Sequence, residues 1–299
     1  MFARFCMILV ALTVAQPGNA AIEVFACEPE WGALVTELAG DKAKVYVATT
    51  AAQNVHHIQA RPSLIAAVRR ANLVVCTGAD LEAGWLPILI RESGNATIQR
   101  GRPGYFEAAR YVAMMDIPTR LDRSDGDVHA MGNPHVHTDP RNLPPIAAAL
   151  SNQLAILDAG NAAMYGERLE NFTNRWRDAL AKWEQKAASL RGIAVVEHHR
   201  SFSYLFNWAG IRVVGYLEPK PGVEPSTGHL ASLLERQKTD RARLIVRASF
   251  NDPRASQWFA ERAKIPAIVL PYSVGGNASS KDLFTWFDSM IDLLVAASQ

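Results

Sequence analysis

Residues 72–77, Asn-Leu-Val-Val-Cys-Thr, are the stretch of sequence that decides the fold. The run is almost continuously apolar and β-type, and Gly78 ends it. A strand without polar alternation is typical of a parallel sheet, because helices cover both faces of such a sheet. The sequence therefore predicts a sheet that is buried on both sides.

The residues before this strand alternate between strand and helix patterns with short connections, which predicts an α/β lobe. A further helix is expected at 142–159, since Pro144 and Pro145 are tolerated in a first helical turn. The other expected elements are strands at 23–26 and 45–47, a helix at 31–39 and a helix that starts near Pro62.

The alternation resumes after Gly192 and predicts a second α/β lobe. Ligands of such lobes bind beyond the carboxyl ends of the strands. The expected elements are strands at 193–196, 211–214, 244–246 and 267–270, and helices at 202–208, 229–236, 255–263 and 283–297.

Residues 161–190, between the two lobes, have the pattern of one long helix of about 45 Å. Its large apolar side chains recur at steps of four and three, so they share one face and are expected to pack. They are Tyr165, Leu169, Phe172, Trp176, Leu180 and Trp183. We expect a first lobe at 21–160, a linking helix at 161–190 and a second lobe at 191–299.

Residues 1–20 have the pattern of a cleavable signal peptide. Arg4 precedes an apolar run that ends at Val14, and a helix breaker and small residues follow. The run is too short to span a bilayer, and no later apolar stretch is long enough to do so. We therefore expect a soluble chain that is exported to the periplasm.

The net charge bears on the classes of partner to expect, and the two cysteines bear on a possible disulfide. The 299-residue chain has a net charge of +2, and loss of residues 1–20, in which Arg4 is the one charged residue, leaves +1. This balance gives no reason to expect nucleic acid or an anionic membrane as a partner. Cys27 and Cys76 lie in strand-like runs and could form a disulfide or remain two buried thiols.

Three histidine clusters indicate a metal site. Each cluster alone could be solvent-exposed or hydrogen-bonded, but imidazole is a good zinc ligand, and ligands from separate segments can meet in a cleft between two lobes. The clusters are His56-His57, His135-Val136-His137 and His198-His199, which hold six of the eight histidines.

Four segments around these clusters resemble motifs of the zinc- and manganese-binding solute-binding proteins of bacterial ABC transporters. They are 54–63 (Asn-Val-His-His-Ile-Gln-Ala-Arg-Pro-Ser), 133–140 (Asn-Pro-His-Val-His-Thr-Asp-Pro), 199–205 (His-Arg-Ser-Phe-Ser-Tyr-Leu) and 219–226 (Pro-Lys-Pro-Gly-Val-Glu-Pro-Ser).

The resemblance implies roles for individual residues. His56, His135 and His199 would be the metal ligands, and the adjacent His57, His137 and His198 would not. The ion would be bound as cargo and delivered to a membrane permease of an ABC transporter. We expect the carrier to be a monomer.

Three departures from the family pattern leave the fourth ligand open. Residues 270–272 read Leu-Pro-Tyr where the family commonly has an aspartate ligand, and Val55 replaces a proline. Water or a carboxylate such as Glu28 could occupy the fourth position. The long histidine-rich loop of many members is reduced to residues 122–129, which could catch metal or be a simple solvated loop.

Nitrogen-rich ligation favours zinc, since manganese prefers oxygen ligands, although affinity order alone does not separate zinc from copper or nickel. We expect zinc affinity to decrease at pH values below about 6.5, where free imidazole is protonated.

A three-histidine zinc site could also belong to a hydrolase. No His-Glu-x-x-His or nucleophile motif is present. The family resemblance implies a carrier and not an enzyme. A surface adhesin with an incidental metal is the third class.

Overall fold

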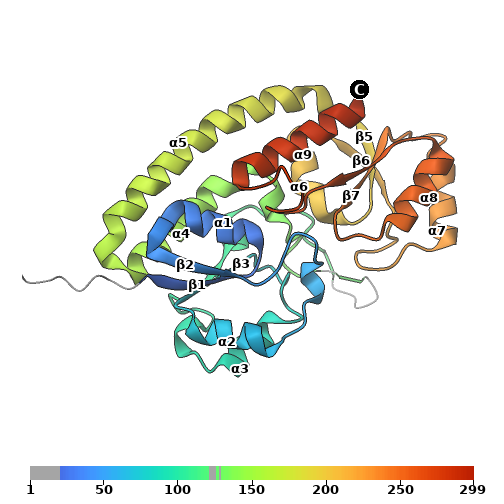
Figure 1. Ribbon diagram of the computed structural model, residues 1–299. Coiled ribbons are helices and arrows are strands. Elements are labelled where there is room, and N and C mark those ends of the chain that lie inside the picture. The colour runs from blue at the N-terminus through green and yellow to red at the C-terminus, as the bar shows by residue number, and fades with distance from the viewer. Residues whose placement is uncertain (1–20, 121–125, 128) are drawn as a thin grey trace, which may run out of the picture.

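The computed structural model describes residues 21–120, 126–127 and 129–299, and within these ranges it forms two four-stranded parallel sheets (Figure 1). The predicted signal peptide lies outside the described residues. The strand orders are β2-β1-β3-β4 and β6-β5-β7-β8, so both halves repeat one topology. The strands are β1 (Ile22–Ala26), β2 (Ala43–Val47), β3 (Leu73–Cys76), β4 (Tyr105–Glu107), β5 (Ala194–Glu197), β6 (Arg212–Tyr216), β7 (Leu244–Ala248) and β8 (Ala267–Leu270).

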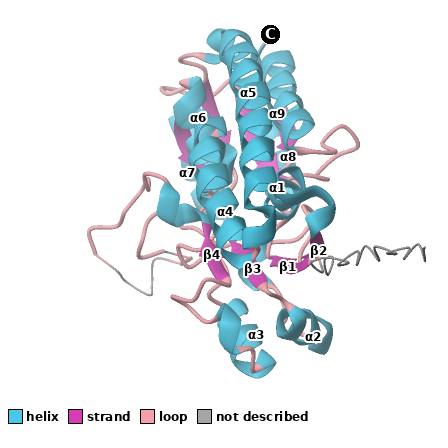
Figure 2. Ribbon diagram, turned by 90° about the vertical axis from the view of Figure 1, so that its left-hand side faces the viewer, coloured by secondary structure: helices cyan, strands magenta, loops and turns pink. Residues whose placement is uncertain are grey.

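Helices cover both faces of each sheet, which confirms the predicted pair of α/β lobes. Between the sheets lies one continuous hydrophobic core, to which strands of both halves contribute, and α5, α9, α1 and α4 run side by side there (Figure 2). Smaller clusters lie on the outer faces, under α2 and α3 and under α7 and α8. The helices are α1 (Pro29–Ala39), α2 (Pro62–Arg70), α3 (Leu86–Ser93), α4 (Leu143–Leu157), α5 (Ala162–Ala187), α6 (Ser203–Ala209), α7 (Thr227–Arg236), α8 (Pro253–Ala263) and α9 (Leu283–Ser298).

The long linking helix is confirmed as α5, which continues into a 3-10 turn at Ala188–Leu190. Its predicted aromatic stripe is buried against both halves of the chain. The indole N–H of Trp176 donates to the carbonyl of Pro140 at 2.8 Å, and that of Trp183 donates to Asp288 of α9 at 2.8 Å. The helix is therefore fixed to both halves along its length (Figure 1).

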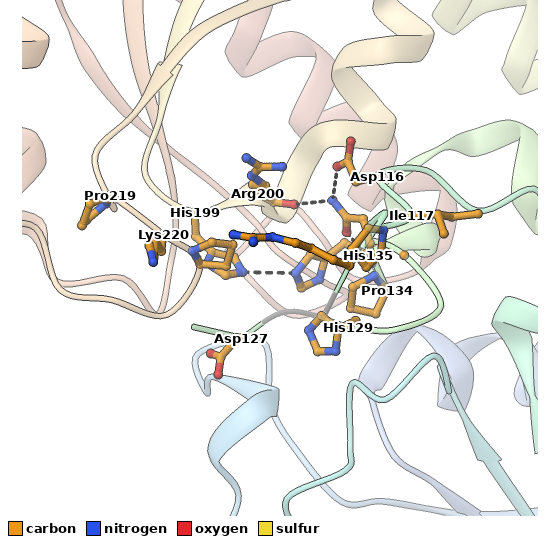
Figure 3. A pocket seen from close by; sticks show the side chains of 15 residues that line it. Asp116, Ile117, Asp127, His129, Pro134, His135, His199, Arg200, Pro219 and Lys220 are labelled. Carbon is orange, nitrogen blue, oxygen red and sulfur yellow. Dashed lines mark hydrogen bonds between the residues drawn. The ribbon is translucent and has the colours of Figure 1, made fainter. Parts of the chain in front are cut away.

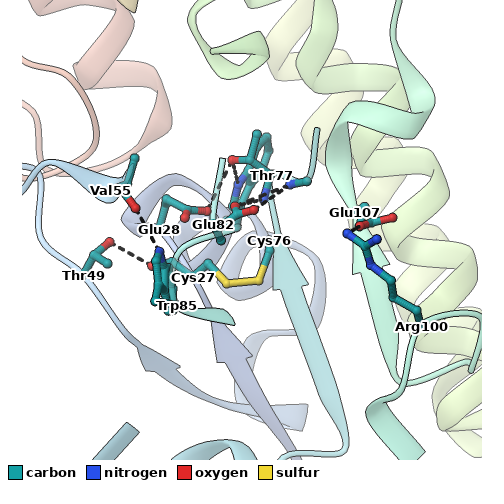
Figure 4. The surroundings of a disulfide bond; sticks show 12 residues. Cys27, Glu28, Thr49, Val55, Cys76, Thr77, Glu82, Trp85, Arg100 and Glu107 are labelled. Atoms are coloured by element: carbon teal, nitrogen blue, oxygen red, sulfur yellow. Dashed lines mark hydrogen bonds and ion pairs between the residues drawn. A yellow bond between two sulfur atoms is a disulfide. The ribbon is translucent and has the colours of Figure 1, made fainter. Parts of the chain in front are cut away.

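The two central strands of the first sheet settle the state of the cysteines. Cys27 directly follows β1 and Cys76 ends β3, and these two strands are paired. Their Cα atoms lie 4.8 Å apart and the sulfur atoms form a disulfide (Figure 4). Of the two states that the sequence left open, the structure has the bonded one.

Helix α3 and strand β4 were not expected from the sequence. Strand β4 has three residues and is placed by its pairing with β3 at the edge of the sheet. Among the described helices, none is both long and apolar enough to cross a membrane.

Candidate metal centre

The structure brings together the three histidines that the resemblance selects. One ring nitrogen of each of His56, His135 and His199 lies within 4.8 Å of the other two, and the side chains are at most 9% exposed. The Nε2 atoms of His135 and His199 are 3.4 Å apart. A cavity of about 400 Å³ beside them is lined by residues of both halves (Figure 3).

Two of the three histidines are positioned by the same local hydrogen bond, which their backbone N–H donates to the side chain of an asparagine two residues earlier. The Asn54 side chain accepts a hydrogen bond from the backbone N–H of His56 at 3.1 Å. In the same way, Asn133 accepts from the backbone N–H of His135 at 3.0 Å. Such a side-chain turn fixes the backbone before each ligand position.

Asn133 also fixes its segment to the second half of the chain. Its amide donates to the carbonyl of Arg200 at 3.1 Å, directly after His199. The hydroxyl of Tyr204 donates to the carbonyl of Asn133 at 2.9 Å. These bonds hold the first-half histidine beside the second-half one.

Each of the three rings has a partner at Nδ1. Asn54 Oδ1 lies 2.9 Å from Nδ1 of His56. The Tyr272 hydroxyl lies 2.7 Å from Nδ1 of His135, and Glu218 Oε2 lies 2.7 Å from Nδ1 of His199. Asn54 Oδ1 and the carboxylate of Glu218 accept hydrogen bonds from Nδ1–H, which leaves the Nε2 lone pairs of His56 and His199 available to a metal. Such outer partners orient ligating imidazoles and raise their basicity.

The electrostatics of the site favour neutral imidazoles. Burial, together with the neighbouring ring of His199, lowers the pKa of His56 well below its usual value. Burial and the same neighbour lower the pKa of His135 well below its usual value. Since a metal binds only the unprotonated ring, both groups are in the binding form at neutral pH.

The chain as a whole matches a known family. The model of the zinc-uptake complex component A family (ZnuA), described as periplasmic, matches residues 24–297. The chain belongs to this family. ZnuA proteins are components of zinc uptake and are periplasmic, and the family is one of substrate-binding proteins, not of enzymes. No curated protein sequence matches the chain significantly.

Solved structures share the fold at low sequence identity. The crystal structure of ZnuA has a TM-score of 0.77 and 17% identity, over 93% of this chain and 100% of that one. A manganese-bound mutant of a periplasmic metal-binding protein from Candidatus Liberibacter asiaticus has a TM-score of 0.75 and 14% identity, over 92% and 99%. A mutant laminin-binding adhesin (Lmb) from Streptococcus agalactiae has a TM-score of 0.75 and 20% identity, over 93% and 100%.

The histidines that adjoin the three central ones in the sequence, His57, His137 and His198, lie in different surroundings. The side chain of His57 is 63% exposed. The ring of His137 is fully buried, donates to the carbonyl of Tyr272 at 3.3 Å and faces Glu30 at 3.6 Å. His198 lies 3.8 Å from Glu218 Oε1. None of the three belongs to the group of donor atoms formed by the other histidines.

Glu28, the carboxylate suggested as a fourth ligand, is not part of that group of donor atoms. It is fully buried beside Thr77, whose hydroxyl donates to it at 3.3 Å, and it shares a hydrogen bond with Glu82 (Figure 4). Burial, and then the nearby charge of Glu82, raises the pKa of Glu28 well above its usual value. Glu28 therefore belongs to a buried carboxyl pair under the site.

Sequence reasoning missed the residues that support the three histidines. Asn54 and Asn133 had a detectable signal, because asparagine two residues before a histidine occurs in both motifs. Tyr272 stands at the flagged Leu-Pro-Tyr departure, but its contact with His135 was not foreseen. Glu218 carried no signal. His129, a loop residue in the sequence, lies 3.2 Å from His56 between Nε2 atoms.

Proposed function

We propose that this protein captures zinc in the periplasm and delivers it to the membrane permease of an ABC transporter. His56 and His135 of the first half and His199 of the second would bind the ion through Nε2. The halves correspond to a first lobe at 21–160 and a second at 191–299, joined by the helix at 161–190, with residues 1–20 removed on export.

The observation that carries this proposal is the meeting of three ring nitrogens, one each from His56, His135 and His199, whose rings come from both halves. Outer partners at Nδ1 and the lowered pKa values of two rings support metal binding, since they favour the unprotonated ligand. Membership of a zinc-uptake family supports zinc as the cargo. Three nitrogen donors also favour zinc over manganese.

Binding is tested on the mature chain after metal removal with a chelator. Competition with a zinc-sensitive dye is expected to give one tight zinc site per chain and much weaker binding of manganese. His56→Ala, His135→Ala and His199→Ala should each weaken zinc binding strongly. Tight binding that survives all three substitutions, or a preference for manganese, would contradict the proposal.

Delivery is tested in cells that lack the gene for this protein. The wild-type gene is expected to restore growth and zinc uptake under zinc limitation, whereas the His199→Ala gene should not. Equal rescue by both genes would contradict delivery through this site.

A carrier is proposed instead of a zinc hydrolase, because the family is one of substrate-binding proteins. Ester hydrolysis by the zinc-loaded protein should not exceed that of free zinc. Faster turnover that is lost in His199→Ala would favour the hydrolase.

A further inference from the structure

His129 is outside the proposed ligand set, and its ring nitrogen lies close to that of His56. It is half-buried and, together with His135 and His199, lines the cavity of about 400 Å³ (Figure 3). Its Nε2 atom lies 3.2 Å from Nε2 of His56, and the two ring centroids are 5.2 Å apart. Because Nδ1 of His56 faces Asn54, the atom of His56 that faces His129 is its metal-binding nitrogen.

The two close pairs of nitrogen atoms have the spacing of a tetrahedral zinc site. With Zn–N bonds of about 2.0–2.1 Å, neighbouring ligands in a tetrahedron lie roughly 3.3 Å apart. The Nε2 atoms of His56 and His129 are 3.2 Å apart, and those of His135 and His199 are 3.4 Å apart. Each pair therefore has the spacing of one edge of such a tetrahedron.

His129 lies outside the group of ring nitrogens that are all within 4.8 Å of one another. Its ring must therefore move toward His135 and His199 when an ion binds. The other three rings come from better-buried positions, so the remaining adjustment falls on His129.

The segment that carries His129 is fixed across the cavity to the second half. The backbone N–H of Asp127 donates to the carbonyl of Pro221 at 2.8 Å. The next residue of that turn, Gly222, donates its N–H to Glu218, the outer partner of His199, at 2.8 Å. A Cβ on Gly222 would lie 2.2 Å from the Asp127 carboxylate, so the two segments are in direct contact. The segment just before His129 is thus anchored to the second half of the chain.

We propose that His129 is the fourth zinc ligand, so that four imidazoles enclose the ion. This inference rests on the proposed function. It assigns His129 to the fourth coordination position, which an aspartate commonly fills in the family. An all-nitrogen set disfavours manganese, which prefers oxygen ligands. His129 is therefore a residue that determines metal selectivity as well as affinity.

The test compares His129→Ala with His57→Ala in the mature chain. X-ray absorption at the zinc edge should count four imidazoles in the wild type and in His57→Ala, and three in His129→Ala. The zinc affinity of His129→Ala, measured by chelator competition, should fall at least about tenfold. Its affinity ratio of zinc to manganese should fall as well.

Three imidazoles in the wild type, or an unchanged affinity in His129→Ala, would overturn the inference. His56→Ala separates this failure from that of the proposed function. If His56→Ala loses zinc while His129→Ala keeps it, only the role of His129 is wrong. If both variants keep it, the proposed site itself is wrong.

Discussion

Glu218 Oε2 lies 2.7 Å from Nδ1 of His199 and also accepts the backbone N–H of Gly222 at 2.8 Å. One carboxylate oxygen thus orients the imidazole and fixes the turn that follows β6. Glu218→Gln keeps the shape but removes the charge that favours the Nδ1–H form. We expect zinc affinity to fall by about 10- to 100-fold.

Chelator competition on the purified variants measures this loss. Glu224→Gln is the matched control, because Glu224 is exposed on the same turn. A Glu218→Gln protein that binds zinc as tightly as the control would show that Glu218 has no part in orienting His199.

Tyr272 has the corresponding role for His135, with its hydroxyl 2.7 Å from Nδ1. In Tyr272→Phe the ring can keep its edge contacts with Phe202 and Phe250, so the fold should survive. Zinc affinity is expected to fall by about tenfold, because the imidazole loses its outer partner. The control is Tyr165→Phe in α5, which removes a hydroxyl that donates to Asp158 and should bind zinc normally. Equal affinities of the two variants would refute the role of Tyr272.

The neighbouring residues His198 and His199 give a direct test of register. His199→Ala is expected to lower zinc affinity by more than about 100-fold, since a ligand loss should exceed the loss of an outer partner. His198→Ala should have a much smaller effect, because His198 lies outside the group of donor nitrogens. Calorimetric zinc titration of both variants measures the difference. Equal losses would mean that the ligand has been assigned one residue out of register.

The buried pair Glu28 and Glu82 predicts how stability depends on pH. Burial raises the pKa of Glu82 to about 7. Burial and the charge of Glu82 raise the pKa of Glu28 well above its usual value. The folded chain therefore keeps protons that the unfolded chain releases near pH 4.5. The stabilisation from this pair is complete below pH 4.5 and is lost as the pH rises through 7.

Glu28→Gln should flatten this dependence, since an amide N–H replaces the shared proton. Urea unfolding measures how far the free energy of unfolding decreases between pH 5 and pH 8. This decrease should be smaller in the variant than in the wild type by on the order of 2 kcal/mol. Glu23→Gln, which changes an exposed carboxylate paired with Lys44, is the control. Parallel pH profiles of wild type and Glu28→Gln would contradict the prediction.

Much of the fold could be predicted because its strands are short, continuous apolar runs separated by amphipathic helices. The aromatic stripe of α5 follows directly from helical spacing, and it is buried as expected. Strand β4 was missed because three residues carry no periodic signal, and only pairing with β3 makes Tyr105–Glu107 a strand.

The candidate site could be predicted only in part. The histidine clusters and the family resemblance selected the three rings that the fold brings together. Their outer partners depend on tertiary structure, since Tyr272 is 137 residues from His135 in the sequence. His129 could not be distinguished from a solvated loop residue, because its contact with His56, 73 residues earlier in the sequence, exists only in the folded chain.

The disulfide also bears on where an incoming ion can settle. Cys27, Cys76 and Glu82 form the other group of potential donors, apart from the three histidines, that the structure places within 4.8 Å in the part of the chain that it describes. A metal binds thiolates, and two sulfur atoms joined to each other offer none. The disulfide thus removes two soft donors from the buried interior, so they do not compete with the proposed imidazole site.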